Sequence, residues 1–269
     1  MADRTELDEL ITVVMANKKY QAMTPILVER LCQSALDKGL QTKAAVKEVR
    51  NKLHQVANAY FTHPLDYKQI SARLNHLPCS ITNNEVKDYC RKLMELHTST
   101  SERLPILPEF FHTCLEPIAP VTSILDLACG LNPLAIPWMP VAASFTYHCC
   151  DIYQDMIHFM QTFFNHFHIQ GNASTCDLAG AVSLEKTQIS LLLKSIPCLE
   201  QLGKGTASRI LDSIPSQHIL VSFPVHSLGG RNKGMPEFYK DQLLKMVTDR
   251  PWQVREYRFS TELAFLISK

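Results

Sequence analysis

The second half of the chain alternates short apolar runs with longer amphipathic segments, and this alternation restricts the possible fold more than any other feature. Four runs have the length and composition of buried β-strands, namely 123–127, 145–150, 188–193 and 218–223. Because strands that are connected by helices pair in parallel, the pattern favours a parallel sheet with helices on its faces. We therefore predict an α/β fold for the part of the chain after residue 115.

Two further strand-like runs end the chain, at 252–259 and 262–267. Only a turn separates them, which leaves no room for the crossover helix that parallel neighbours need. We therefore predict an antiparallel hairpin that closes the parallel sheet on one side.

The part of the chain up to about residue 115 is different, because it has helical periodicity and no strand signal of any length. Helices are predicted near 42–60 and near 83–97, among others. The chain is thus predicted to consist of an all-helical domain, 1–115, followed by an α/β domain, 116–269.

Two local patterns in this first part predict where helices begin. Thr24 and Pro25 have the arrangement of an N-cap followed by a first-turn proline. Ser99 and Glu102 have the spacing of a capping box, which predicts a further short helix after Ser99.

Basic residues are concentrated near the start of the chain, although the net charge of the whole is only +1. Residues 11–75 contain ten Lys and Arg against four Asp and Glu, whereas residues 119–269 contain twelve of each sign. The ten cations are Lys18, Lys19, Arg30, Lys38, Lys43, Lys47, Arg50, Lys52, Lys68 and Arg73. A regional excess of this kind suits a polyanionic partner, but it fits a solvated helix face as well.

Composition argues against a membrane protein and a metal protein. No apolar run reaches the roughly 18–20 residues that span a bilayer. The acidic start MADRTELDEL does not resemble a targeting leader, so we expect a cytoplasmic protein without a membrane partner. The nine cysteines form no C-x-x-C pair and no Cys/His cluster, so we expect reduced packing thiols and no metal.

The first predicted strand runs into a turn of small residues, with the sequence ILDLACGLNP over 124–133. In a doubly wound sheet this turn lies at a crevice, where Ala128 and Gly130 would let a nucleoside approach the backbone. Cys129 between them is expected to pack as a small buried thiol rather than act as a nucleophile. A single glycine in place of G-x-G-x-x-G disfavours a dinucleotide, which leaves a ligand without phosphates or a turn without any ligand.

Carboxylates follow the next two strand-like runs. Asp151 comes about twenty residues after the turn, where a carboxylate can accept both hydroxyls of a ribose. Asp177 follows the short run 173–176, where it can accept from an exocyclic adenine amine. Each aspartate alone fits a helix cap or a turn, but their shared position after successive strands favours a nucleoside site.

The fourth strand-like run ends at Leu193 and Lys194 without an Asn/Asp-Pro-Pro-aromatic cluster, which enzymes that methylate exocyclic amines commonly carry there. This disfavours an exocyclic amine as a methyl acceptor. Guanine N7 has an in-plane lone pair, so it needs alignment rather than a general base.

After the fifth run, Arg231 and Lys233 lie in a basic loop that could reach phosphates or a base edge, or could simply be a surface loop.

Along nearly its whole length the chain resembles the aminoglycoside-resistance 16S rRNA methyltransferases that modify guanine 1405 at N7. The most specific strings are DLACGLNPL, which begins at Asp126, and SLGGRNKGM, which begins at Ser227. Further matching segments are KKY at 18–20, Leu53 and His54, Tyr60, HTSTSERL from His97, 191–199 and TEL from Thr261. The resemblance implies a class I, Rossmann-like, S-adenosylmethionine-dependent methyltransferase with an N-terminal all-helical domain, and the sheet with its hairpin suits that fold.

The resemblance also implies a set of cofactor-binding residues. These are Tyr60, His97, Thr98, Ser99, Arg103, Ala128, Gly130, Asp151, Asp177, Leu178 and Leu193. Arg103 would bind the methionine carboxylate, a task suited to a planar guanidinium. Asp151 would bind the ribose, and Asp177 with Leu178 would hold the adenine. Tyr60 and the stretch 97–99 would close over the cofactor from the N-terminal domain.

The same resemblance assigns the reaction and its substrate. Lys194, beside Leu193, and Arg231 would be the catalytic residues, and Arg231 with Lys233 would contact the target nucleotide. Lys18 and Lys19 would bind rRNA as part of a basic docking face, and the substrate would be 16S rRNA in the assembled 30S subunit. We expect a monomer that flips the target guanine out of its stack. Ser101 departs from the family, which often carries Lys or Arg there.

Three other functions fit some of these features. Methylation of adenine N1 at the neighbouring nucleotide is disfavoured by the long helical domain and by the SLGGRNKGM string. A non-catalytic rRNA-binding factor would bind rRNA but not S-adenosylmethionine. A small-molecule methyltransferase would not need the basic N-terminal region.

Overall fold

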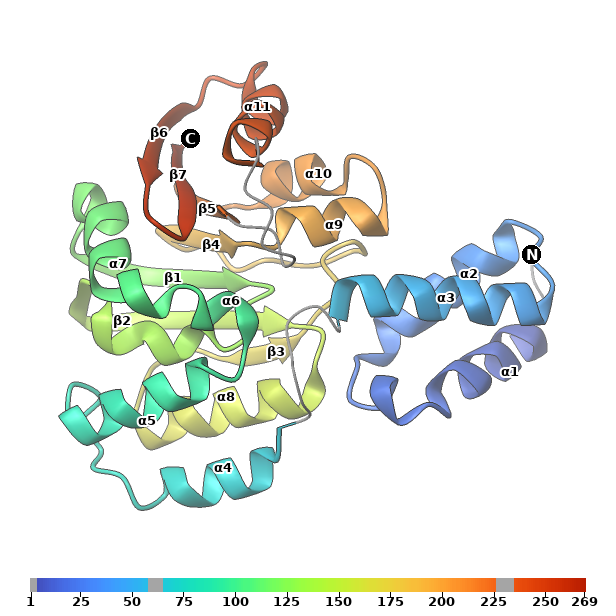
Figure 1. Cartoon of the computed structure of the whole chain (residues 1–269), viewed down its shortest axis with the longest axis horizontal. Helices are drawn as coiled ribbons and strands as arrows, with labels where there is room; N and C mark the ends of the chain where they lie inside the picture. The colour runs from blue at the N-terminus through green and yellow to red at the C-terminus, as the bar shows by residue number, and fades with distance from the viewer. Residues whose placement is uncertain (1–3, 58–64, 226–234) are drawn as a thin grey trace.

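The computed structural model describes residues 4–57, 65–225 and 235–269, and Figure 1 shows them as a sheet domain with a helical lobe projecting from one side. The lobe consists of α1 (Arg4–Met15), a 3-10 helix (Lys18–Tyr20), α2 (Pro25–Asp37) and α3 (Thr42–Ala57). Its apolar core is separate from that of the sheet and includes the fully buried Leu10, Leu27 and Leu53. The lobe therefore holds its three helices together through side chains of its own.

One mixed sheet of seven strands forms the centre of the other part. The strands are β1 (Val121–Leu127), β2 (Val141–Asp151), β3 (Ala173–Thr175), β4 (Ile189–Leu193), β5 (His218–Pro224), β6 (Gln253–Arg258) and β7 (Glu262–Ser268). They lie in the order β3-β2-β1-β4-β5-β7-β6, and the first five pair in parallel while β7 is antiparallel to both β5 and β6. The predicted parallel sheet with a C-terminal antiparallel hairpin is confirmed.

Helices cover both faces of this sheet, because alternate side chains of each strand point to opposite sides. Ile124 of β1 packs into the core on one face, and the neighbouring Leu125 packs into the core on the other. The first face carries α4 (Tyr67–Leu74), α5 (Asn84–Met94), α7 (Leu107–Leu115) and α8 (Gln154–His166). The second carries α9 (Ile196–Leu202), α10 (Thr206–Ser213) and α11 (Met235–Val247). None of the helices in the described ranges is long and apolar enough to cross a membrane.

Packing divides the predicted helical domain into two parts. Helices α4, α5 and α7 share one apolar core with the sheet, whereas α1–α3 share a core with one another. Residues 65–115 are therefore built into the sheet domain, and residues 4–57 form the projecting lobe. The boundary at residue 115 stays a prediction.

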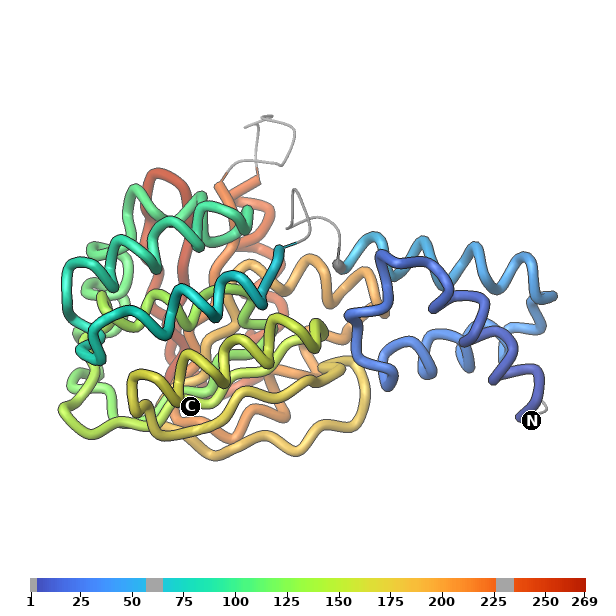
Figure 2. The backbone as a smooth tube through the Cα atoms, turned by 90° about the horizontal axis from the view of Figure 1, so that it is seen from below, coloured from blue at the N-terminus to red at the C-terminus, as the bar shows by residue number. Residues whose placement is uncertain are grey.

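The lobe lies beside the edge of the sheet toward which the arrows of the parallel strands point in Figure 1, and Figure 2 shows the lobe on the same side after a quarter turn. Hydrogen bonds to the backbone join the two parts. Thr24 N donates to Ile152 O at 2.7 Å, and Gln154 N donates to Ala22 O at 2.7 Å. Lys52 of α3 donates to backbone carbonyls at the end of α9. The lobe thus contacts the segments that follow β2 and β4.

Most predicted helix boundaries are close to those observed, and one is wrong. Thr24 is the N-cap of α2 with Pro25 in the first turn, as predicted. The helix predicted at 42–60 is helical to residue 57, and its last three residues lie outside the described ones. The capping box at Ser99 is wrong, because α6 (Thr98–Ser101) begins after an extended His97 and Ser99 is already helical.

Candidate cofactor pocket

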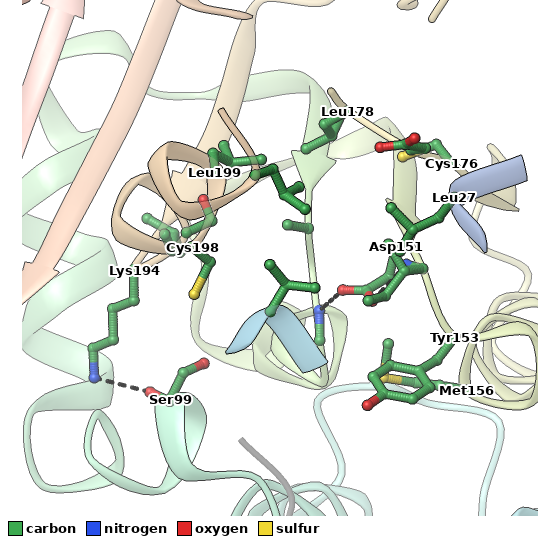
Figure 3. Close-up of a pocket in the computed structure, with 18 of the residues that line it drawn as sticks. Leu27, Ser99, Asp151, Tyr153, Met156, Cys176, Leu178, Lys194, Cys198 and Leu199 are labelled. Atoms are coloured by element: carbon green, nitrogen blue, oxygen red, sulfur yellow. Dashed lines mark hydrogen bonds between the residues drawn. The ribbon is translucent and has the colours of Figure 1, made fainter. Parts of the chain in front are cut away.

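A pocket lies at the carboxyl ends of β1, β2 and β4, where the sheet, α6 and the helical lobe meet (Figure 3). In doubly wound sheets, ligands bind in a crevice outside the carboxyl ends of the parallel strands. Its lining contains most of the predicted cofactor residues, namely His97, Ser99, Ala128, Gly130, Asp151, Asp177, Leu178 and Leu193, and it also contains Lys194, which was predicted to be catalytic. The structure therefore brings together side chains that are far apart in the sequence.

The turn after β1 approaches the pocket through an uncommon backbone conformation. Ala128 and Gly130 both have a φ of +52°. A Cβ on Gly130 would lie 2.8 Å from Cε1 of His97, so the ring of His97 packs directly on the glycine. Burial raises the pKa of the Cys129 thiol well above its ordinary value, which agrees with a packing thiol rather than a nucleophile.

Asp151 ends β2 with both carboxylate oxygens bound to backbone amides. Gly130 N donates to Oδ2 at 2.9 Å, and Ile152 N donates to Oδ1 at 2.7 Å. Burial raises the pKa of this carboxyl group, and these hydrogen bonds act in the opposite direction. Backbone amides of the Gly130 turn and of the segment after β2, including that of Tyr153, hold the carboxylate, which has a further lone-pair site that can accept from a hydroxyl.

Asp177 is bound by a cation from the helical lobe. The Nε of Arg30, on α2, donates to Oδ2, and its Nη2 donates to Oδ1 at 3.0 Å. Ala179 N donates to Oδ1 at 3.1 Å as well. The side chain of Asp177 is 1% exposed, and it lines the pocket beside Leu178.

Lys194 follows β4 with a φ of +57°, and its side chain leads away from Asp151 toward α6 (Figure 3). The Nζ donates to the carbonyl of Ser99 at 3.0 Å and to Oε2 of Glu102 at 2.8 Å. It also lies 3.4 Å from Oε2 of Glu262. The ammonium group thus joins the end of β4 to α6 and to the start of β7.

Arg103 does not line the pocket in this structure but lies fully buried behind it. Its Nη2 donates to Oε1 of Glu262 at 2.6 Å, and its Nη1 donates to Oδ1 of Asn132 at 2.8 Å. The guanidinium carbon lies 4.8 Å from the ring centre of Phe110. The predicted binding of a methionine carboxylate by Arg103 stays a prediction.

Glu262 is the anion that balances these two cations. Burial acts to raise its pKa, but Arg103 and Lys194 outweigh burial, and the pKa lies below its ordinary value. Ser222 Oγ donates to Oε1 at 2.6 Å. Pairing of Glu262 with Pro224 in the sheet register sets the carboxylate at this edge.

Another buried carboxylate, that of Asp126, is hydrogen-bonded to Asn132, which follows the turn. Asp126 accepts from Asn132 Nδ2 at 2.8 Å and from Tyr147 OH at 2.7 Å. Burial raises its pKa to about 7, and the two hydrogen bonds oppose that effect. Because Asn132 also accepts from Arg103, the turn is connected to the buried ion pair.

His97 is neutral in the folded protein. Burial, together with the nearby Lys194 and Arg103, lowers its pKa to about 3. Its Nδ1 lies 3.4 Å from Ser99 Oγ. An uncharged imidazole can pack against the Gly130 turn without adding a third cation to this cluster.

The remaining predicted residues lie elsewhere or cannot be placed. Thr98 begins α6 and is absent from the pocket lining. Lys18 and Lys19 are exposed on the lobe, in the 3-10 helix. Tyr60, Arg231 and Lys233 lie outside the described residues.

Sequence reasoning missed much of the apolar wall. These residues are Leu27, Val56, Ile152, Tyr153, Met156, Cys198, Leu199 and Leu202. Leu27 and Val56 have helical spacing typical of a lobe core, so no sequence signal indicates that they reach the pocket. The hydroxyl of Ser195 also lines the pocket and has no hydrogen-bond partner among the described residues.

The residues present suit a nucleoside that carries an amino acid rather than a nucleotide. Two carboxylates, Asp151 and Asp177, can accept from hydroxyl and amine groups, and apolar side chains make up much of the remaining lining. Carboxylates would repel phosphates, whereas a sulfonium is compatible with them. Within the described residues no group of three or more His, Cys, Asp or Glu could hold a metal ion. The pocket therefore fits S-adenosylmethionine.

Comparison with known proteins gives consistent matches along the chain. A curated relative from Micromonospora echinospora, named 16S rRNA (guanine(1405)-N(7))-methyltransferase, is 31% identical and covers 100% of this chain and 98% of the relative. A relative of the same name from Serratia marcescens is 32% identical, and the match covers 87% of this chain and 86% of the relative.

Solved structures agree with the sequence relatives. The 16S rRNA methyltransferase RmtF, in complex with S-adenosyl-L-homocysteine, has a TM-score of 0.80 at 26% identity, with 100% of both chains covered. The 16S rRNA methylase RmtB has a TM-score of 0.80 at 26% identity, with 98% of both chains covered. The family model described as ribosomal RNA methyltransferase (FmrO) matches residues 16–266. With the Rossmann-like sheet and the nucleoside pocket described above, these matches place the chain in the FmrO family of ribosomal RNA methyltransferases.

Proposed function

We propose that this chain transfers the methyl group of S-adenosylmethionine to N7 of guanine 1405 in 16S rRNA within the 30S subunit, and so confers aminoglycoside resistance. The observation that carries the proposal is the pocket whose lining includes both Asp151 and Asp177, in a chain whose full-length relatives bear that enzyme name. The alternatives are methylation of N1 of the neighbouring adenine and a non-catalytic role in rRNA binding.

In this proposal the pocket residues bind and orient rather than exchange protons. Asp151 accepts from the ribose hydroxyls, and Asp177 accepts from the adenine amine. The cofactor supplies a methyl group activated by a positive sulfonium. N7 of guanine has its own lone pair, so the rate depends on how well the pocket aligns it with that methyl group.

Lys194 and Arg103 are proposed to shape the reacting end of the pocket. Lys194 reverses the chain after β4 through its positive φ and ties that turn to α6 through Ser99 and Glu102. Arg103 is held by Glu262 beside the same edge, and we propose that its guanidinium attracts the carboxylate of the methionine part. Arg231, outside the described residues, is proposed as the second catalytic residue.

The helical lobe is proposed to dock the ribosomal subunit. Lys18 and Lys19 are exposed there, in a part of the chain with an excess of cations. Contacts between cations and phosphates release counterions, so binding should weaken steeply as salt is added. Tyr60 and Lys233 keep their proposed roles over the cofactor and at the target nucleotide.

The direct test is to incubate the protein with bacterial 30S subunits and labelled S-adenosylmethionine. Borohydride and aniline cleavage followed by primer extension then maps the modified nucleotide. A new break at guanine 1405 is the expected result. Label on the neighbouring adenine would favour the N1 alternative, and tight 30S binding without label would favour a non-catalytic factor.

A further inference from the structure

The contact between Arg30 and Asp177 crosses from the helical lobe to the cofactor pocket. The two residues are 147 positions apart in the sequence. The guanidinium engages both carboxylate oxygens through Nε and Nη2, which is the planar, two-point geometry that Arg forms with carboxylates. The Asp177 side chain is 1% exposed and that of Arg30 is 29% exposed, so the pair is largely shielded from water.

Hydrogen-bond capacity determines what Asp177 can still do in this position. Each carboxylate oxygen has two lone-pair sites. Oδ1 accepts from Arg30 Nη2 and from Ala179 N, so both of its sites are used. Oδ2 accepts from Arg30 Nε, and its second site is the one that can receive another donor.

We propose that Arg30 is a positioning residue for adenine recognition, which fixes Asp177 so that Oδ2 accepts from the amine of the cofactor. The inference rests on the proposed use of S-adenosylmethionine. Without the guanidinium the carboxylate could rotate about its Cα–Cβ and Cβ–Cγ bonds, and the amine would meet a group that must first be ordered. A residue that fixes a binding group in advance increases affinity, because less conformational freedom is lost when the ligand binds.

The lobe thereby becomes part of the pocket, rather than an rRNA-docking appendage alone. Leu27 precedes Arg30 by one turn of α2 and lines the same pocket. Val56 of α3 lines it as well. Two apolar side chains and one cation from the lobe therefore cover the adenine end.

The test compares two ligands that differ at the adenine amine, S-adenosylhomocysteine and S-inosylhomocysteine, by titration calorimetry. The second carries a carbonyl at C6 in place of the amine, so its 6-substituent cannot donate to Oδ2 and presents an acceptor to the carboxylate instead. Wild-type protein should bind S-adenosylhomocysteine about tenfold more tightly or better, since a hydrogen bond to a charged group contributes that much. Arg30→Met should lower this ratio of the two affinities to near one. Arg30→Lys should give an intermediate ratio, because lysine has the positive charge but not the planar, two-point geometry of a guanidinium.

Lys38→Met is the matched control. Lys38 lies at the end of the same helix and pairs with Glu48 on the surface, with 52% of its side chain exposed. The ligand ratio of this variant should equal that of wild type. Circular dichroism should confirm that all variants remain folded.

Two results would overturn the inference. One is an unchanged ligand ratio in Arg30→Met, and the other is tighter binding of S-adenosylhomocysteine in that variant, which would mean that Arg30 competes with the amine. Methylation of 30S subunits reports on the proposed function separately. A wild-type protein that selects S-adenosylhomocysteine but does not methylate guanine 1405 would refute that function and leave the role of Arg30 standing.

Discussion

Replacement of Glu262 by Gln should destabilise the protein strongly. The carboxylate has 0% exposed surface and faces the Arg103 guanidinium at 2.6 Å and the Lys194 ammonium at 3.4 Å. Gln has nearly the same shape but no charge, and its amide donors would face other donors. Removal of one partner from a buried ion pair costs about 3–5 kcal/mol because the remaining charge is left uncompensated. That is a large part of the roughly 5–15 kcal/mol by which folded proteins are stable.

Urea unfolding followed by circular dichroism at pH 7 measures this loss. Glu256→Gln on β6 is the matched control, because Glu256 pairs with Lys240 and Arg258 while 25% of its side chain is exposed. Pairs of that kind contribute at most about 1 kcal/mol. If Glu262→Gln lost no more stability than the control, the buried cluster would not hold this edge of the sheet together, and the reasoning would be refuted.

The pH dependence of stability provides a second readout of Glu262. Its pKa in the folded protein lies below the usual 4.5, so its contribution is present above pH 4.5. The contribution is lost as the pH falls through the folded pKa, since protonation then removes the charge. Glu262→Gln should therefore be less sensitive to acid than wild type as the pH falls below 4.5, as followed by unfolding over a pH series.

Three other changes give distinct outcomes. Gly130→Ala should lose both stability and affinity for S-adenosylhomocysteine, because its Cβ would lie 2.8 Å from the ring of His97. Gly39→Ala is the control, since nothing lies within 4 Å of its Cβ. Its free energy of unfolding in urea should fall by only about 1–2 kcal/mol, because of the positive φ at this position. Asp126 has a folded pKa of about 7, above 3.8, so wild type must lose stability from this group as the pH rises through that interval. Between these two pH values the stability of Asp126→Asn relative to wild type should rise by about 1.4 kcal/mol per pH unit, as measured by unfolding. Equal pH profiles for the two proteins would contradict this. Asp151→Ala should weaken S-adenosylhomocysteine binding by about tenfold or more in calorimetry with an unchanged far-ultraviolet spectrum, and wild-type affinity would disprove its place in the site.

Local patterns were sufficient to predict the sheet and the two aspartates of the pocket. Runs that are mostly apolar, such as 188–193, indicate strands that are buried on both faces. Asp151 and Asp177 follow such runs directly, and the carboxyl ends of parallel strands meet at one edge. At Ser99 the local pattern misplaced the start of the helix, which follows an extended His97 whose ring packs against the Gly130 turn, a contact between distant segments.

The sequence by itself determined the class of fold, the family and the position of the carboxylates, since all three depend on segments of a few residues. Only the tertiary structure decided which charges are paired. Arg103 meets Glu262 across 159 positions of the sequence, and Arg30 meets Asp177 across 147. No periodicity or spacing predicts such pairs, because a buried charge is stable only where a partner from another element arrives within hydrogen-bond distance. For the same reason, local sequence predicts the lobe as a basic helical region, whereas its part in the pocket depends on how α2 lies against the segments that follow the strands.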